Sequence, residues 1–504
     1  MTINFNEVAQ SVRASNLFIE MAGQRRSFAG LFISPKVGLI GCYDPAKTAV
    51  VDYEPVKVSS KEKVGELFGF GSHIHRQALA MPDAVFDSCE VYAFPVPDNA
   101  SAVDATETIT FTGASTSAGT LYFSIGGVLV SVAVASGADV ATIAAALVSA
   151  ITAKRDIAVT AANTSGVVTL TAKTSGTPGN EILVVQNPSG DVQEADAPSG
   201  VTVAIENSDG YLDGGTGAPD IEDVFFNADG TDKLGDRWYT IFTCPFTDST
   251  NLGYIEAAGD MRAAAGVHRH FGAYAAYVQK TYDEALAIPA TINKKWIGDV
   301  WDSRCYAPAF EFGAALVGRI AYEQLLAPNR PYKQTSVGLA CDGSQGDLGS
   351  AKLDALFRAG MGYCTVSSDG TMYFGDIPLT YRTTPLGAAT EEWFDAVSLH
   401  LKQAKAYSIE QLFISEPYTR GVVVDDEAVT AYEWAISPKT IIADMAKLID
   451  ELWARFAWTK NAEKVIEGLT AEINEANNSR IDAQVTDDPA QALRIIAMKY
   501  AFLY

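Results

Sequence analysis

Two histidine pairs are the residues of this sequence whose type and spacing could bind a metal. His73 and His75 are separated by one residue, and so are His268 and His270. On a strand, residues two apart project to the same face, so either pair could hold a zinc ion. The first pair lies at an expected helix start, where such positions diverge, and the second has no cysteine or acidic neighbour. We therefore expect surface or interface histidines and no metal site.

Motifs for phosphate binding and nucleophilic catalysis are missing. The sequence has no GxxxxGK[ST] loop and no GxSxG elbow, and 69–71 (GFG) lacks the third glycine of a dinucleotide site. The acidic stretch 227–230 (NADG) lacks the later glutamate of a calcium loop, so we expect a solvated turn. Because catalytic triads assemble in space, these absences argue against an enzyme without excluding one. No catalytic residue and no cofactor is predicted.

Composition narrows the class of protein further. The 504 residues carry a formal charge of −24, which disfavours binding to nucleic-acid phosphates and to anionic membranes. No apolar window reaches the roughly 18 residues that a membrane span needs, and the first residues lack the pattern of a secretory signal. The cysteines are widely spaced and are expected to be free thiols in a reducing compartment: Cys42, Cys89, Cys244, Cys305, Cys341 and Cys364.

The first half of the chain contains strands, short helices and a segment of different composition. Strands are expected at 38–42 and 90–96, and helices at 61–67 and 72–81. From 101 to 215 the chain is rich in Ala, Thr, Ser, Gly and Val, which is typical of a small β-rich insertion. It ends in an expected flexible stretch at 209–218. Its one helix is expected at 140–153, and its strands at 106–112, 119–125, 128–134, 157–161, 167–173 and 182–186.

Strands and helices alternate after residue 220, which predicts an α/β domain with a covered, largely parallel sheet. The expected strands are 238–246, 271–278 and 297–301, followed by a hairpin over 364–374. The expected helices are 248–265, one near Asp283, and 308–326.

The C-terminal hundred residues carry the clearest amphipathic pattern. Ser437 as N-cap and Pro438 as first residue predict a long helix through Phe456. A shorter helix is expected over 462–475 and a strand over 480–485. Both ends of the chain, 16–22 and 493–504, read as strands, and a strand at a free end must pair with something. A neighbouring copy is one candidate.

Several short stretches occur in an order that resembles one known family. They are 15–21 (SNLFIEM), 67–72 (LFGFGS), 90–95 (EVYAFP), 118–182, 237–248 (RWYTIFTCPFTD), 381–383 (YRT) and 437–439 (SPK). Together they resemble the contractile tail sheath subunits of bacteriophages, specifically those of the Mu type. One segment departs from the family: 413–420 (FISEPYTR) stands where relatives carry a basic stretch. A charge-mediated contact through that segment is therefore not expected here.

The resemblance implies a multidomain α/β (α+β) fold. The central α/β sheath domain would be discontinuous, with a small β-rich domain inserted in it, and extended strand arms would form both ends. The implied divisions are an N-terminal arm (1–25), the central domain (26–100 plus 216–390), the insert (101–215), a tube-facing C-terminal domain (391–478) and a C-terminal arm (479–504).

The resemblance also implies a function, which is that of a structural subunit and not an enzyme. Copies would form stacked hexameric rings around a tail tube and contract on a baseplate signal to drive the tube through the host envelope. The implied partners are further copies of the chain, the tail tube protein, and the baseplate and tail terminator proteins, without nucleic acid or membrane insertion. The sheath would belong to the virion tail and be assembled in the host cytoplasm.

Specific residues can be assigned to these roles as expectations. Lys439, Lys447 and Arg455 on the C-terminal helix are possible tube-facing residues, although an ordinary solvated face is equally compatible with the pattern. The expected intersubunit strand arms contain Leu17, Phe18, Ile19, Glu20, Met21, Arg494, Ile495, Ile496, Met498, Tyr500 and Phe502.

Three other functions remain open at this stage. The chain could be the sheath of a related contractile injection machine, such as a bacteriocin or a secretion system. The β-rich segment alone would suit a surface adhesin, which does not explain the α/β part. An enzyme would need polar residues at strand ends, but the ends near Cys244, Gln279 and Asp302 form no recognised set.

Overall fold

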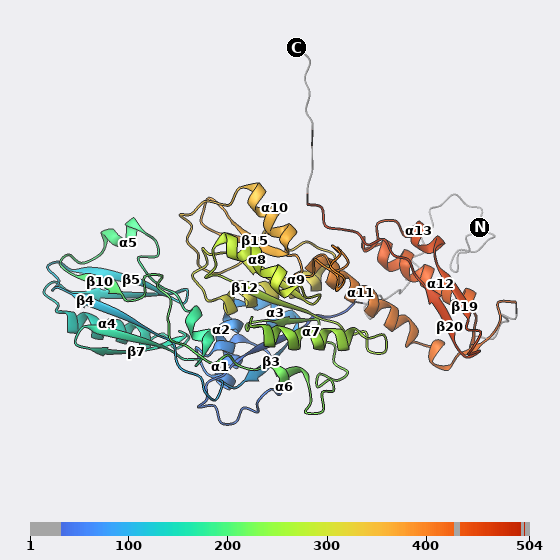
Figure 1. Ribbon diagram of the computed structural model, residues 1–504, viewed down its shortest axis with the longest axis horizontal. Coiled ribbons are helices and arrows are strands. Elements are labelled where there is room, and N and C mark those ends of the chain that lie inside the picture. Colours follow the sequence, from blue (N-terminus) through green and yellow to red (C-terminus); the bar gives the residue numbers. More distant parts are fainter. Residues whose placement is uncertain (1–31, 428–433, 495–497, 499–504) are drawn as a thin grey trace, which may run out of the picture.

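The computed structural model describes residues 32–427, 434–494 and 498. The described chain is elongated, with three parts arranged along its longest axis (Figure 1). The β-rich segment forms one end, the large mixed sheet with its helices lies in the middle, and a small helical part with a β-hairpin forms the other end.

A nine-stranded sheet forms the centre, in the order β14-β16-β15-β13-β12-β11-β1-β3-β2. Neighbouring strands from β15 to β3 run parallel, and the outer strands β2, β16 and β14 are antiparallel. The predicted α/β fold with a largely parallel sheet is confirmed. The bounds are β1 (Lys36–Cys42), β2 (Val56–Val58), β3 (Glu90–Val96), β11 (Ile241–Thr243), β12 (Gly272–Tyr277), β13 (Ile297–Trp301), β14 (Thr335–Ser336), β15 (Met361–Val366) and β16 (Met372–Phe374).

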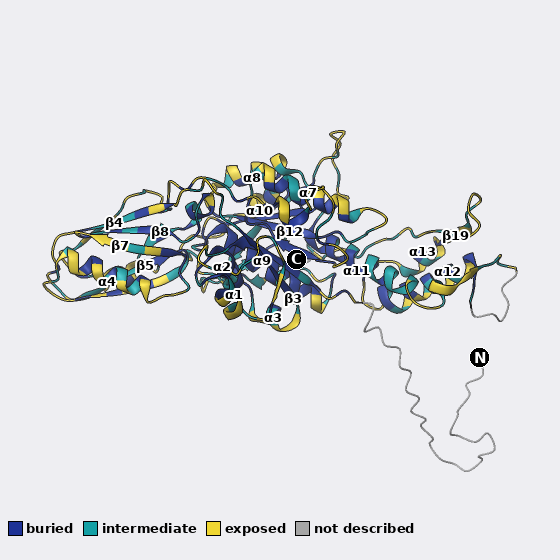
Figure 2. Cartoon of the chain, turned by 90° about the horizontal axis from the view of Figure 1, so that it is seen from below, coloured by how far each residue is buried: buried dark blue, intermediate teal, exposed yellow. Residues whose placement is uncertain are grey.

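Helices cover both faces of this sheet, so its strands are buried on both sides (Figure 2). In β1, Val37 and Leu39 face the core beneath α1 (Lys61–Phe68), α2 (His73–Ala80), α3 (Asp83–Ser88) and α9 (Ala309–Leu326). Ile40 and Cys42 face the opposite core, which includes α6 (Glu222–Phe225) and α7 (Ser249–Ala263). Near β13 and β15, α8 (Tyr282–Ile292) and α10 (Ser350–Ala359) complete the cover.

Several helices begin where their capping residues predict. The side chains of Ser72 and Asp248 accept hydrogen bonds from backbone N–H groups in the first turns of α2 and α7. Pro308 precedes α9, which ends at Leu326 as expected. The strand predicted over 238–246 is shorter, because only β11 pairs within the sheet.

The β-rich segment consists of two sheets packed with one helix. One sheet has the order β10-β4-β8-β7 and the other β6-β5-β9, with α4 against them. Short α5 and strand β10 have no counterpart in the sequence prediction. The bounds are β4 (Thr106–Thr112), β5 (Gly119–Ile125), β6 (Val128–Val134), α4 (Val140–Thr152), β7 (Val159–Thr164), β8 (Val167–Ala172), β9 (Val184–Gln186), α5 (Asp191–Ala195) and β10 (Thr202–Ile205).

The stretch 209–218, expected to be flexible, is fixed in the structure. Its residues Tyr211, Asp213 and Thr216 form backbone bridges to earlier parts of the segment (Leu183, Thr106 and Val103), and Leu212 is buried. Gly210, Gly214 and Gly217 adopt positive φ at the turns, while the backbone between them forms these bridges. The prediction considered the glycines and not the pairing, and it was wrong.

The C-terminal part begins with α11 (Ala396–Phe413), which passes from the central sheet into a separate core. It continues with β17 (Val422–Val423), β18 (Ala435–Ile436), α12 (Pro438–Leu448), a π-helical turn (Ile449–Ala454), α13 (Ala462–Glu467), β19 (Thr470–Ile473) and β20 (Ile481–Gln484). Among the described residues no helix is long and apolar enough to cross a membrane.

Two helix predictions in this part need correction. The α-helix starting at Pro438 ends at Leu448 and continues as a π-helical turn, which inserts an extra residue into the predicted periodicity. The helix predicted over 462–475 ends at Glu467, because the following residues form β19 and pair with β20.

The predicted terminal strands fall mostly outside the described residues. All of 16–22 lies outside them, as do Ile495, Ile496, Tyr500 and Phe502. The described residues Leu493, Arg494 and Met498 are not in a strand within this chain.

Candidate functional site

The edge of the sheet at which α/β enzymes bind ligands is covered by the β-rich segment. Strand order reverses between β1 and β11, and a crevice normally opens beyond the carboxyl ends at such a point. Here Arg76 of α2 donates to the backbone carbonyls of Gly126 (3.0 Å) and Asp156 (3.2 Å). Lys173 donates to the carbonyl of Phe70 at 3.1 Å.

The turn beneath this contact has no room for a side chain. Gly71 has φ +80°, and a Cβ there would lie 2.2 Å from the carbonyl oxygen of Ile157. The GFG stretch is therefore a turn, as predicted, that packs tightly on the β-rich segment. The β-rich segment therefore fills the position at which a ligand would usually bind.

The histidines are mostly buried and neutral. His73 accepts a hydrogen bond from the Cys42 backbone N–H on Nδ1 (3.2 Å), and His75 accepts one from Gly71 (3.0 Å). Burial lowers the pKa of His73 to about 3 and of His75 to about 4. Of the second pair, His270 is buried and only His268 reaches solvent. The expectation of surface histidines was wrong for the buried ones.

No three potential ligands cluster in a metal-binding arrangement within the described part of the chain. The 227–230 stretch forms an exposed turn, as predicted, in which Asp229 accepts a hydrogen bond from the Thr231 hydroxyl at 2.6 Å.

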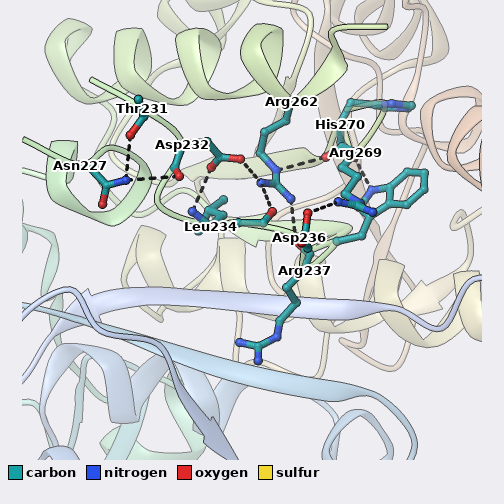
Figure 3. A network of polar contacts seen from close by, with 11 residues as sticks. Asn227, Thr231, Asp232, Leu234, Asp236, Arg237, Arg262, Arg269 and His270 are labelled. Carbon is teal, nitrogen blue, oxygen red and sulfur yellow. Dashed lines mark hydrogen bonds and ion pairs between the residues drawn. The ribbon is translucent and has the colours of Figure 1, made fainter. Parts of the chain in front are cut away.

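Arg262 organises the loop that precedes β11 (Figure 3). The side chain is buried at the end of α7 and forms an ion pair with Asp232. It also donates to the carbonyls of Arg237 (2.6 Å) and Gly235 (3.1 Å). Because the guanidinium satisfies three separate loop positions, this polar cluster fixes the fold and offers no open site.

Both chain ends enter the described structure on one short segment, Phe456–Lys460. The ring of Phe32, the first described residue, lies edge-on to Phe456 (5.2 Å between centroids) and to Trp458 (5.9 Å). We name this segment, residues 456–460, the arm anchor. We call the described residues next to each expected arm the root of that arm. Trp458 is fully buried, so the N-terminal root packs on a residue fixed in the core.

The C-terminal root pairs with the same arm anchor. The backbone N–H of Lys460 donates to the Asp488 carbonyl (2.8 Å), and that of Ala490 donates to the Trp458 carbonyl (3.1 Å). The side chain of Asn329, just beyond α9, donates to the carbonyl of Ala457 at 2.7 Å. The arm anchor therefore joins both roots to the helix that runs through the central core.

Arg494 fixes the end of the described C-terminal root. Its guanidinium forms ion pairs with Asp376 (3.3 Å) and Asp395, and it lies over the rings of Phe357 (5.0 Å) and Phe394 (5.1 Å). This predicted arm residue is thus held by its own chain. Met498 is exposed.

The hairpin β19–β20 offers two unpaired strand edges. In the described structure these strands pair only with each other, and their inner face packs on α12. The Asn474 N–H donates to the Arg480 carbonyl (2.9 Å), so the pair Ala471–Ala483 occupies a position that is not hydrogen-bonded across the hairpin. The backbone N–H and C=O groups of both alanines therefore point outward.

The sequence prediction missed half of this hairpin and the arm anchor. One signal was present: 470–473 (TAEI) and 481–484 (IDAQ) flank the polar turn 474–480. The arm anchor carries no sequence signal, because its partners lie far away in the chain.

The predicted tube-facing residues lie on the exposed side of the C-terminal helices. Lys439 is exposed and reaches Asp426 at 3.9 Å, and Lys447 and Arg455 are exposed as well. Because the π-helical turn intervenes, Arg455 does not continue the α-helical spacing of the two lysines.

Comparison with known proteins yields one relative along the whole chain. No family model matches. The "Mu-like prophage FluMu tail sheath protein" of Haemophilus influenzae is 22% identical over 507 residues, covering 100% of both chains.

Solved structures give weaker likenesses. A sheath tail protein from Listeria innocua has a TM-score of 0.46 at 11% identity, covering 91% of this chain and 92% of that one. The anti-feeding prophage helical sheath in the contracted state gives 0.44 at 9%, covering 97% and 99%. At these scores the likenesses carry no weight of their own. The sequence relative, however, confirms the resemblance inferred from the motifs: this chain is a homologue, along its full length, of a Mu-like tail sheath protein.

Proposed function

We propose that this chain is the structural subunit of a contractile phage tail sheath. Copies polymerise as stacked hexameric rings around the tail tube, and contraction drives the tube through the host envelope. The partners are the tube, baseplate and tail terminator proteins, and the sheath is assembled in the host cytoplasm as part of the virion tail. The full-length sheath relative supports this proposal, and no catalytic role is proposed.

The observation that carries the proposal is that two arm roots and a hairpin with unpaired edges occur in one part of the molecule. Both roots rest on the arm anchor, and β19–β20 presents unpaired backbone groups nearby in the chain. An arm from a neighbouring copy can satisfy these groups by adding a strand, which leaves the side-chain faces free. The arm residues 17–21 and, beyond the fixed Arg494, residues 495–502 are proposed to supply such strands.

A shared anchor suits a sheath that changes shape. Both roots contact residues 456–460, and the C-terminal root then continues to Arg494, which is fixed to Asp376 and Asp395 of the central part. Whole subunits can then reorient as rigid bodies while strands added between copies keep them linked. Energy stored in the assembly removes any need for a nucleotide site.

The domain divisions given above are proposed to correspond to distinct positions in the sheath. The segment 101–215 has its own core and packs only on one end of the central part, which suits an outer position. The C-terminal part would lie against the tube, with Lys439, Lys447 and Arg455 on its exposed face. Replacing both lysines by glutamate tests this: assembly on purified tubes should weaken, whereas sheath polymerisation alone should not.

Truncation of each arm tests the function itself. Removing 1–22 or 495–504 should leave a folded, soluble subunit that forms no long tubes in electron micrographs, whereas the intact chain forms hollow tubes. A cut before residue 495 keeps Ala490 and Arg494, whose contacts stabilise the subunit. A variant with 495–504 replaced by a Gly/Ser segment of equal length controls for length. Normal tubes from either truncation would refute the strand-exchange role of that arm.

A further inference from the structure

Three cysteines from separate segments converge beside the start of α9. Cys305 and Cys364 are buried, and Cys341 is partly exposed; all are free thiols. Cys305 and Cys341 stand directly opposite each other in an antiparallel bridge.

The hydrogen bonds around this bridge define its geometry. The Tyr306 N–H donates to the Ala340 carbonyl (3.0 Å), and the Asp342 N–H donates to the Arg304 carbonyl (2.8 Å). These bonds flank the cysteines, which therefore occupy a non-hydrogen-bonded position, where opposed Cα atoms are about 4.5 Å apart. That separation falls within the range that a disulfide spans, about 4.4–6.8 Å.

The backbone on the Cys305 side is held in place by Arg304. Its guanidinium donates to Asp302 (2.6 and 2.9 Å), Asp347 (2.8 Å) and the Cys364 carbonyl (3.2 Å). Because Arg304 is buried and held by these bonds, the backbone beside Cys305 is fixed. Closing the bond requires the Cys341 thiol to give up its hydrogen bond to the Gly370 carbonyl (3.3 Å).

Only one of the two thiols is accessible to a small molecule. Cys341 lines a groove of about 380 Å³ between the β-rich segment and the central part, together with Tyr306, Leu339 and Gln193, whereas Cys305 does not line it. Burial raises the pKa of both thiols, so reaction is slow at neutral pH and accelerates in mild alkali.

We propose that Cys305 and Cys341 are a redox modification site: they form a disulfide when the folded protein meets a low-molecular-weight disulfide oxidant. The Cys341 thiolate attacks the oxidant, forms a mixed disulfide and releases one thiol. The Cys305 thiolate then attacks the Cys341 sulfur and releases the second thiol. The two cysteines lose two electrons and two protons, and the oxidant becomes two thiols.

The bond would close a loop that contains all of α9 and β14 and would tie them to the segment before the helix. A particle assembled in a reducing cytoplasm and released from the cell meets such oxidants; this setting rests on the proposed function, whereas the chemistry does not.

Oxidised glutathione and peptide mapping test the proposal on the full-length folded protein. After incubation at about pH 8 and alkylation of remaining thiols, trypsin separates the three cysteines, since Arg304, Arg319, Lys333, Lys352, Arg358 and Arg382 divide them. The expected result is loss of two free thiols and one linked peptide pair, 305–319 with 334–352. A link that involves Cys364, or no link while thiols disappear elsewhere, overturns the proposal.

Variants separate the two steps. Cys305→Ser should accumulate a stable glutathione adduct on Cys341, whereas Cys341→Ser should lose reaction at this site at least tenfold. Cys89→Ser, which removes a thiol that packs elsewhere on α9, is the matched control and should link normally. Equal adduct formation on Cys305 in the Cys341→Ser variant would refute the assigned order.

Discussion

Arg76 and Glu311 form a buried, bidentate ion pair that joins α2 to the first turn of α9. The Nε and one terminal nitrogen of Arg76 each lie 2.7 Å from a carboxylate oxygen of Glu311. The two side chains are 8% and 3% exposed. Since the same guanidinium also bonds Gly126 and Asp156, a single side chain connects the central core with the β-rich segment.

Removal of one partner of this pair should be strongly destabilising. Glu311→Ala leaves the Arg76 charge buried without its counter-ion, which costs about 3–5 kcal/mol of unfolding free energy. The double variant Arg76→Met/Glu311→Leu should recover part of that loss, because neither charge remains, but the carbonyls of Gly126 and Asp156 lose their donor. Urea unfolding of both variants measures this. A loss below about 1 kcal/mol in the single variant would show that the pair does not matter for stability.

The burial of Asp299 predicts an unusual pH dependence of the unfolding free energy. The side chain is fully buried in β13, both carboxyl oxygens lack a hydrogen-bond partner, and burial raises its pKa to about 8. Between the ordinary pKa near 4 and about 8, the folded state binds this proton more tightly than the unfolded state. Raising the pH through this window therefore lowers the unfolding free energy by up to about 1.4 kcal/mol per unit.

Asp299→Asn removes this titration and isolates its effect. The variant and the parent should have similar stability near pH 4, and the variant should gain relative to the parent as the pH rises toward 8. Chemical denaturation at several pH values measures the difference. A constant difference across that range would contradict the shifted pKa of Asp299.

Much of the fold was predictable because its signals are local. Strand alternation at β4 to β6, the N-caps Ser72 and Asp248, and the Pro308 start of α9 each depend on neighbouring residues. The helix expected over 462–475 failed because β19 is decided by its partner β20, a tertiary pairing that overrides helix propensity.

The candidate site was less predictable for the same reason. The terminal strands were predicted from the local sequence at the two ends of the chain. The arm anchor, by contrast, forms because Phe32, Asn329 and Asp488 contact residues 456–460 in space. Arg494 likewise looked like one position of a strand, whereas two acidic residues distant in sequence hold it.

The Arg494 contacts should determine how firmly the C-terminal arm is rooted. Arg494→Ala removes two ion pairs and the stacking on Phe357 and Phe394, and should lower unfolding free energy by about 1–3 kcal/mol. Arg494→Lys keeps the charge without the planar fork and should lie in between. Thermal unfolding of the subunit measures the loss of stability, and disassembly of tubes in urea measures how firmly the arm is rooted. Equal behaviour of Lys and Ala variants would show that charge contributes nothing.

The outward edge of β20 provides the sharpest test of strand addition. Ala483 is exposed, and its N–H points away from β19, so Ala483→Pro removes one outward donor without breaking a hydrogen bond inside the hairpin. A strand from another copy needs that donor. The variant should therefore fold with nearly unchanged thermal stability but form few or no tubes in electron micrographs.

Two further variants identify the edge that is used. Ala483→Thr keeps the N–H and has a strong strand preference, so it should assemble normally and serves as the matched control. Ala471→Pro makes the corresponding change on the edge of β19. If Ala483→Pro assembles like the parent and Ala471→Pro does not, the arm pairs with β19. If both proline variants assemble normally, the hairpin is not the acceptor, because an added strand on either edge would have lost a backbone hydrogen bond at its centre.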